Sequence, residues 1–162
     1  MSTADRGPLA IRPEDFPFAD SINVGIAVSK WNPNVTEGLL NGALAVLKQC
    51  GISADRIELM RTPGSFELPL AAQWLCEKNE IQGAIVLGSV IQGETRHFDF
   101  VCQGVTQGTM DVSLKTGKPV VFGVLTDNTM EQALARSGGA MGNKGEECAL
   151  ALLEMIALQQ GG

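Results

Sequence analysis

The chain has 162 residues, which is long enough for one domain with a sizeable buried core and too short for two ordinary ones. Hydrophobic residues make up 44% and charged residues 19%, without low-complexity tracts or internal repeats, as is typical of a globular protein. The formal net charge of -6 argues against a nucleic-acid partner, because phosphate backbones are bound by clustered lysines and arginines.

Membrane-spanning and secretory patterns are missing from the sequence. The apolar stretches are interrupted by glycine or charge well before bilayer-spanning length, and residues 1–13 carry Asp5, Arg6 and Arg12 in place of an apolar signal-peptide core. We therefore expect no membrane association and a cytoplasmic location.

The N-terminal residues lack periodicity. Pro8, Pro13 and Pro17 fall within residues 1–21, and this segment is predicted to be an extended arm. The pattern becomes regular at residue 22, which predicts a single domain over residues 22–162.

Strand and helix patterns alternate through this domain. Short apolar runs predict strands at residues 23–29, 56–61, 83–87 and 119–125. Apolar residues at helical spacing predict helices at residues 35–50, 66–78, 98–115, 130–137 and 144–159, the last two separated by a glycine-rich turn at 138–142. Right-handed crossovers then place helices on both faces of a parallel sheet. The predicted class is an α/β fold, a three-layer α/β/α sandwich with a four-stranded parallel sheet.

The cysteines do not form a metal-binding pattern. Cys50, Cys76, Cys102 and Cys148 lie far apart, and the chain has one histidine to join them. We expect buried free thiols and no metal site.

Ligands of such sheets bind beyond the carboxyl ends of the strands, near the point where the strand order reverses. This rule selects the loops at residues 30–35, 62–66, 88–97 and 126–129.

The loop at residues 88–97 leads directly into a predicted helix. Glu94 and Thr95 could hold a phosphate through the unpaired main-chain N–H groups of the helix start. The alternative is an ordinary helix cap with Thr95 as the capping oxygen. His97, the single histidine, can exchange protons near neutral pH, although a lone histidine can equally be structural or merely exposed.

Two other loops carry aromatic residues. Phe66 could stack on a planar ring while Glu67 accepts hydrogen bonds from its N–H groups or from sugar hydroxyls; an ordinary helix start is the alternative. Trp31 and Asn32 offer a second aromatic face and an amide, unless Trp31 only packs on the domain.

The segment at residues 138–145 contains glycines and Lys144, but Asn143 precedes the lysine and the segment joins two helices, so it is not a Walker A phosphate loop. Arg136, at the end of the preceding helix, is either a cation at a negative helix end or a phosphate ligand.

Taken together and in order, these motifs resemble the 6,7-dimethyl-8-ribityllumazine synthase family, with collinear similarity from about residue 22 to residue 158. The motifs are Trp31-Asn32, Gly64-Ser65-Phe66-Glu67, Val90-Ile91-Gln92-Gly93-Glu94-Thr95-Arg96-His97-Phe98, Phe122-Gly123-Val124-Leu125-Thr126, Arg136-Ser137-Gly138 and Gly142-Asn143-Lys144-Gly145. The resemblance implies a flavodoxin-like fold.

The resemblance also implies an activity, the penultimate step of riboflavin synthesis. In this step 5-amino-6-(D-ribitylamino)uracil condenses with 3,4-dihydroxy-2-butanone 4-phosphate, and phosphate and water are released without a cofactor or metal. His97 corresponds to the proton-transfer residue. Phosphate binding is implied for Glu94, Thr95 and Arg136. Binding of the pyrimidine or its ribityl chain is implied for Trp31, Asn32, Ser65, Phe66, Glu67, Ser89, Val90, Ile91, Phe122 and Lys144.

The resemblance further implies a homo-pentamer with sites between neighbouring subunits, Phe122 and Arg136 coming from one subunit and His97 from the other. Some members assemble twelve pentamers into a 60-subunit icosahedral shell, and the short turn at residues 138–143 is compatible with that form. Two positions depart from the family pattern, Gln92 in place of a basic residue and Trp31 in place of phenylalanine. The alternatives on the same fold are a non-catalytic shell protein and a protein that binds a flavin or lumazine without converting it.

Overall fold

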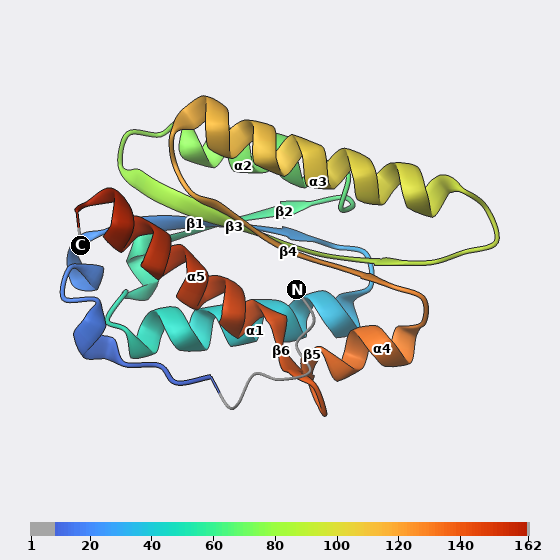
Figure 1. The fold of residues 1–162 in the computed structure, drawn as a ribbon, viewed down its shortest axis with the longest axis horizontal. Helices are drawn as coiled ribbons and strands as arrows, with labels where there is room; N and C mark the ends of the chain where they lie inside the picture. Colours follow the sequence, from blue (N-terminus) through green and yellow to red (C-terminus); the bar gives the residue numbers. More distant parts are fainter. Residues whose placement is uncertain (1–8, 162) are drawn as a thin grey trace.

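The sheet is the centre of the molecule. The computed structural model describes residues 9–161. It contains four parallel strands, β1 (Asn23–Ser29), β2 (Ile57–Thr62), β3 (Ile81–Ile91) and β4 (Val120–Asp127), in the spatial order β2-β1-β3-β4 (Figure 1).

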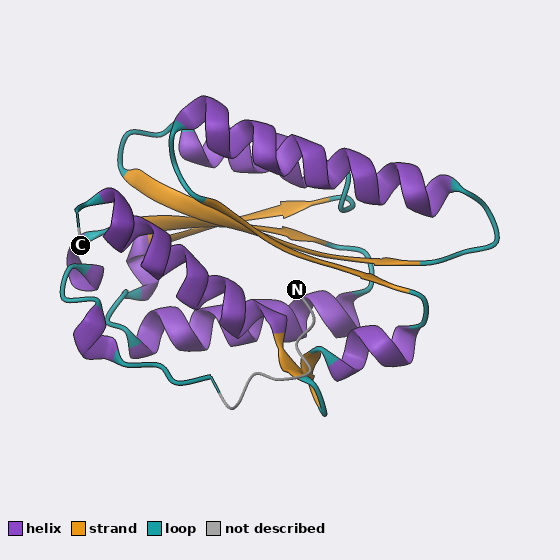
Figure 2. Cartoon of the chain, viewed as in Figure 1, coloured by secondary structure: helices purple, strands orange, loops and turns teal. Residues whose placement is uncertain are grey.

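Helices cover both faces of this sheet. α2 (Leu68–Cys76) and α3 (His97–Thr116) lie on one face, and α1 (Pro33–Gln49), α4 (Met130–Ala135) and α5 (Lys144–Gln159) lie on the other (Figure 2). The predicted three-layer α/β/α sandwich with a flavodoxin-like, four-stranded parallel sheet is therefore confirmed. None of the helices in residues 9–161 is both long and apolar enough to cross a membrane.

The sheet separates two hydrophobic cores. Ile26 and Leu87 belong to the core shared with α1 and α5, whereas Ala27 and Val86 belong to the core shared with α2 and α3. Because side chains alternate across a strand, a central strand that is covered on both faces is apolar at consecutive positions. This explains why β1 and β3 are such continuous apolar runs.

Two differences from the predicted boundaries affect the loops at the carboxyl edge of the sheet. β3 continues to Ile91 instead of ending at residue 87, because its last residues pair with β4 from Gly88↔Val124 to Ile91↔Asp127. The predicted loop at 88–97 therefore begins as strand.

The glycine-rich turn is a short antiparallel hairpin formed by β5 (Ser137–Gly139) and β6 (Gly142–Asn143). Gly138 and Gly142 have φ values of 113° and 81°, which a residue with a side chain rarely adopts. As a result, α4 ends at Ala135, and Ser137 lies in the hairpin instead of the predicted helix.

The described part of the N-terminal segment packs on the domain. Residues 9–21 form two 3-10 helices, Pro13–Asp15 and Ala19–Ser21, and Phe16 and Ala19 are buried in the core beside α1 and α5. Residues 1–8 of the predicted arm lie outside the described residues, and the domain boundary at residue 22 stays a prediction.

Helices α1 and α5 approach closely where α5 begins. Asn143 caps α5 by accepting a hydrogen bond from the N–H of Gly145 (2.8 Å), and its side-chain amide donates to the carbonyl of Gly38 in α1 (2.9 Å). A Cβ atom on Gly145 would collide with the backbone carbonyl of Leu39. The contact requires glycine because a backbone atom cannot move aside as a side chain can.

We expect Gly145→Ala to lower the free energy of unfolding by about 2–3 kcal/mol, because the added methyl group forces α1 and α5 apart. Urea unfolding followed by circular dichroism measures this change. Gly93→Ala is the control, because nothing lies within 4 Å of its added Cβ. Equal stabilities of the two variants would contradict the close packing.

The four cysteines are free thiols; Cys50, Cys76 and Cys148 are buried and Cys102 is half-buried. Burial raises the pKa of the Cys148 thiol to about 12, above its ordinary value, because a thiolate beside α1 and β4 would lose its hydration.

This shift predicts a loss of stability at alkaline pH. The pKa of Cys148 in the folded chain lies above its pKa in the unfolded chain. The full free energy of unfolding is therefore kept below about pH 9. Between about pH 9 and pH 12 it decreases by about 1.4 kcal/mol per pH unit, because only the unfolded chain ionises there. Urea unfolding between pH 8 and pH 10 should show a smaller loss for Cys148→Ala than for the parent chain. An identical pH dependence would contradict the prediction.

Candidate active site

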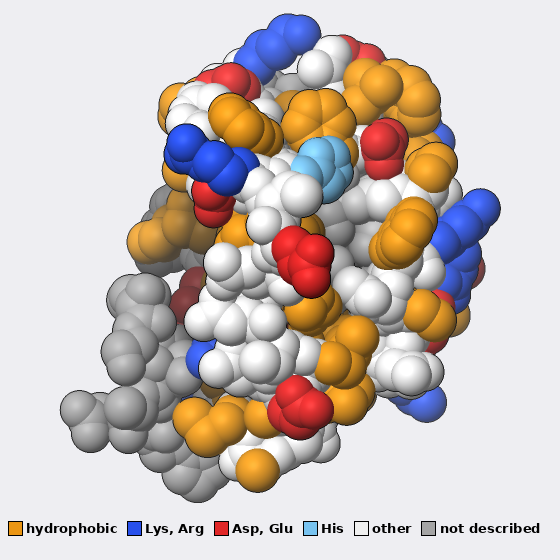
Figure 3. Space-filling model, turned by 90° about the vertical axis from the view of Figure 1, so that its right-hand side faces the viewer, with side chains coloured by type: hydrophobic (Ala, Val, Ile, Leu, Met, Phe, Trp, Pro, Cys, Tyr) orange, Lys and Arg blue, Asp and Glu red, His pale blue; other side chains and the backbone are white. Residues whose placement is uncertain are grey.

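A pocket of about 560 Å³ opens at the carboxyl edge of the sheet. The chain leaves β1 toward β2 on one side and returns on the other side to form β3, so the loops after these strands diverge and leave a space between them. Figure 3 shows this face, with the single histidine next to hydrophobic side chains and carboxylates. The lining residues are Trp31, Asn32, Pro63, Gly64, Ser65, Phe66, Glu67, Ser89, Val90, Ile91, His97 and Val101.

Two exposed aromatic side chains form walls of the pocket. Trp31 is 71% exposed and Phe66 is 59% exposed. Both rings lie against glycines: a Cβ on Gly64 would be 3.7 Å from Trp31 Cδ1, and a Cβ on Gly104 of α3 would be 2.6 Å from Phe66 Cε2. Large exposed aromatic faces beside a cavity can stack on a planar ligand.

The turn between β2 and α2 holds Glu67 in place. Glu67 Oε2 accepts a hydrogen bond from the N–H of Gly64 at 2.8 Å, and the carbonyl of Gly64 accepts one from the Thr62 hydroxyl at 2.8 Å. Ser65 is buried behind this turn and its hydroxyl lies 3.5 Å from that of Ser29. The carboxylate of Glu67 is therefore fixed at the pocket before a ligand arrives.

The end of β3 forms another wall. Ser89, Val90 and Ile91 are strand residues that pair with β4, so their main chain is rigid. The carbonyl of Ser89 accepts a hydrogen bond from Asn32 Nδ2 at 3.0 Å. The Ser89 hydroxyl is buried and has no hydrogen-bond partner within residues 9–161.

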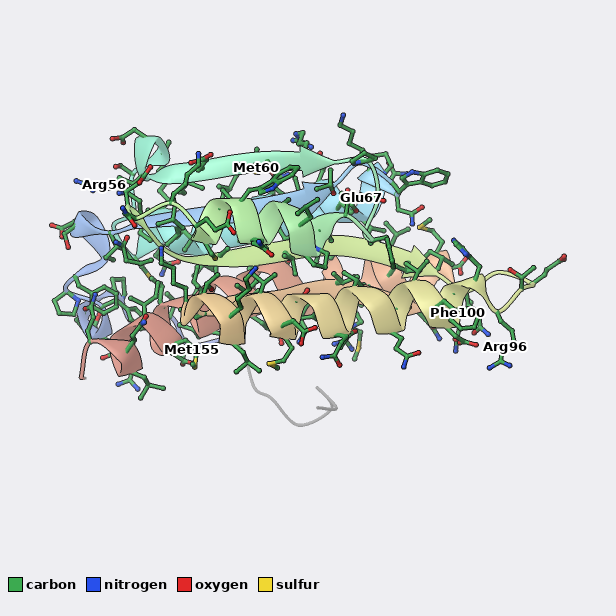
Figure 4. The ribbon with its side chains drawn as sticks, turned by 90° about the horizontal axis from the view of Figure 1, so that it is seen from above. Arg56, Met60, Glu67, Arg96, Phe100 and Met155 are labelled. Carbon is green, nitrogen blue, oxygen red and sulfur yellow. The ribbon has the colours of Figure 1, made fainter. Side chains whose placement is uncertain are left out.

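His97 is the first residue of α3 and its exposed side chain lines the pocket. The main-chain N–H of His97 donates to the Thr95 hydroxyl at 3.4 Å, but the N-cap position of α3 is Arg96, whose side chain makes no capping hydrogen bond. Seen from above, Arg96 extends beyond the start of α3, away from Glu67, and Phe100 lies one turn further along the helix (Figure 4).

Five of the predicted residues lie outside the pocket lining: Glu94, Thr95, Phe122, Arg136 and Lys144. Glu94 and Thr95 are exposed in the loop next to the pocket. Phe122 lies in β4 and packs on the core beside α2 and α3.

Arg136 and Lys144 flank the hairpin on the other side of the sheet. The carbonyl of Arg136 accepts a hydrogen bond from the N–H of Lys144 at 2.8 Å, and Lys144 Nζ pairs with Glu147 Oε2 at 2.6 Å. Burial raises the pKa of the Asp127 carboxyl, and the charge of Arg136 acts in the opposite direction. The chain therefore carries two separate groups of predicted site residues.

Sequence reasoning missed three lining residues as site residues, Pro63, Gly64 and Val101. Val101 follows His97 by four residues, so helical spacing alone places both on one face of α3, and this signal could have identified it. Within residues 9–161, no group of three or more His, Cys, Asp or Glu side chains could hold a metal ion.

Comparison with known proteins agrees with this geometry. The family model described as 6,7-dimethyl-8-ribityllumazine synthase matches residues 21–160. A protein of that name from Flavobacterium johnsoniae is 46% identical over 160 residues, which are 99% of this chain and 84% of that protein. One from Cytophaga hutchinsonii is 48% identical over 157 residues, covering 97% and 98% of the two chains. The match spans the sheet, every loop of the pocket and the hairpin, and so the chain belongs to the 6,7-dimethyl-8-ribityllumazine synthase family.

Proposed function

We propose that the pocket condenses 5-amino-6-(D-ribitylamino)uracil with 3,4-dihydroxy-2-butanone 4-phosphate to give 6,7-dimethyl-8-ribityllumazine, releasing phosphate and water. The observation that carries the proposal is the meeting of Trp31, Phe66, Glu67 and His97 in one pocket in a chain of this family. A cytoplasmic location is part of the proposal and accords with the free thiols.

The pyrimidine has a suitable place between the aromatic side chains. Trp31 and Phe66 offer faces for stacking, and the main chain of Val90 and Ile91 offers polar groups at the ring edge. Ser65 and Glu67 then accept hydrogen bonds from the ribityl hydroxyls. Because Gly64 already holds the Glu67 carboxylate, little side-chain entropy is lost on binding.

His97 is the proton-transfer residue of the proposal. The pyrimidine amine attacks the ketone of the second substrate, and loss of water gives an imine. Phosphate then leaves, and the ring closes with loss of water. These steps need protons moved between nitrogen and oxygen atoms while the reactants are held together, which one imidazole beside the pyrimidine can do.

The phosphate site requires residues from both groups described above. Glu94 and Thr95 contribute main-chain N–H groups near the start of α3, with the carboxylate of Glu94 directed away. Arg136 contributes a guanidinium. We propose that Phe122, Arg136 and Lys144 reach this pocket from a neighbouring subunit of a homo-pentamer, with a 60-subunit shell of twelve pentamers as a further form.

Exposed apolar side chains support such an assembly. Trp74 and Leu70 on α2, and Met110 and Leu114 on α3, are each at least half exposed. Apolar surface of this kind is typical of a protein–protein interface.

We expect the purified chain to form the fluorescent lumazine from the two substrates, and His97→Ala to turn over about 10²- to 10⁴-fold more slowly without losing all activity. The reason is that orientation by the remaining pocket residues persists. Steady-state fluorescence measures both rates, with Lys115→Ala, at the far end of α3, as the control.

An unchanged rate in His97→Ala would exclude it from the mechanism. If the parent chain binds the pyrimidine without converting it, the chain is a ligand-binding protein, and if it binds neither substrate, it is a shell protein.

Shared sites predict complementation. We expect the His97→Ala and Arg136→Ala variants each to have low activity alone. A co-assembled one-to-one mixture should recover about a quarter of the parent activity. The reason is that, in random assembly, about a quarter of the sites receive both a wild-type His97 and a wild-type Arg136. Native mass spectrometry should show multiples of five subunits. A mixture no more active than the sum of its components would contradict the shared site.

A further inference from the structure

The loop between β1 and α1 contains an unusual backbone conformation. Asn32 has φ 54° and ψ 56°, and within residues 9–161 it is the one non-glycine residue with a positive φ. The left-handed conformation is unfavourable for a residue with a Cβ, although asparagine tolerates it better than most. Such a residue persists where surrounding contacts hold it, and these places cluster at functional sites.

Hydrogen bonds hold Asn32 from both sides. Its carbonyl accepts the N–H groups of Val35 and Thr36 at 2.9 and 3.0 Å, which begins α1. Its side-chain Nδ2 donates to the carbonyl of Ser89 in β3 at 3.0 Å. One residue thus ties the start of α1 to the end of a strand far away in the sequence.

This hydrogen bond joins two segments that line the pocket. Trp31, the residue before Asn32, belongs to one of these segments and Ser89 to the other. On the β2 side, the N–H of Lys30 bonds to the carbonyl of Thr62 at 3.0 Å, so the backbone around Trp31 is fixed at both ends. The distance between the tryptophan and the β3 edge therefore depends on the bond from Asn32 to Ser89.

We infer that Asn32 is a positioning residue that sets the width of the pyrimidine slot by binding the carbonyl of Ser89. This inference rests on the proposed function. It assigns the amide donor of Asn32 to the protein instead of the substrate, and it leaves ring-edge recognition to Val90 and Ile91. Trp31 is the stacking group whose position the amide controls.

Asn32→Gly removes the side-chain hydrogen bond to Ser89 but keeps the backbone conformation, because glycine adopts a positive φ without strain. Asn34→Gly is the matched control: it makes the same substitution two residues later in the first turn of α1, at an exposed position. Both are made in a Trp74→Phe background, in which Trp31 is the only tryptophan of the chain and reports on the pocket by fluorescence.

We expect Asn32→Gly to raise the KM of the pyrimidine and its Kd from Trp31 quenching by about 3- to 10-fold, the worth of one hydrogen bond. The kcat and the KM of the phosphorylated ketone should stay within about twofold of the control. Asn32→Asp should bind more weakly still, because its carboxylate would face the Ser89 carbonyl.

The ligand-free protein distinguishes positioning from direct binding. If Asn32 positions Trp31, then Asn32→Gly must change the Trp31 emission maximum and its quenching by acrylamide before any substrate is added. Spectra identical to those of Asn34→Gly would overturn the inference, whatever the KM. If the parent chain makes no lumazine, the proposed function fails, but the ligand-free comparison still decides the role of Asn32.

Discussion

The pairing of β1 with β3 is the interaction on which the structure depends. Both strands are buried on two faces, so each contributes side chains to both cores. Because the chain diverges from this pair in opposite directions, the loops after β1, β2 and β3 open around a space at one edge of the sheet. The strand order thus determines where the pocket lies, and the side chains that line it determine its chemistry.

Most of the fold could be predicted because its determinants are local. The Val- and Ile-rich run of β1 and the helical spacing of α1 and α5 each lie within one segment. The extension of β3 to Ile91 could not be predicted this way, since it depends on pairing with β4, whose partner residues lie 36 positions later, as in Gly88↔Val124. The hairpin β5–β6 was missed because glycines indicate a turn without specifying which strands it joins.

The residues of the candidate site also divide into those that local sequence predicts and those that it does not. Trp31, Phe66, Glu67 and His97 could be placed at one edge because each follows a strand or begins a helix there. The spacing of residues along the sequence does not predict that Arg136 and Lys144 lie outside this pocket in a single chain. The sequence also did not show that the amide of Asn32 is already bonded to Ser89, because side-chain partners depend on distances between distant segments.

The contact between Phe66 and Gly104 has a consequence for how this chain can evolve. A methyl group at position 104 would meet the Phe66 ring, which can move, instead of backbone. Helix α3 could therefore accept the methyl group with little loss of folded protein. In the proposed function Phe66 stacks on the pyrimidine, and the displaced ring would tilt out of that plane. Selection at this glycine would act on the turnover of substrate, whereas selection at Gly145 would act on the amount of folded protein.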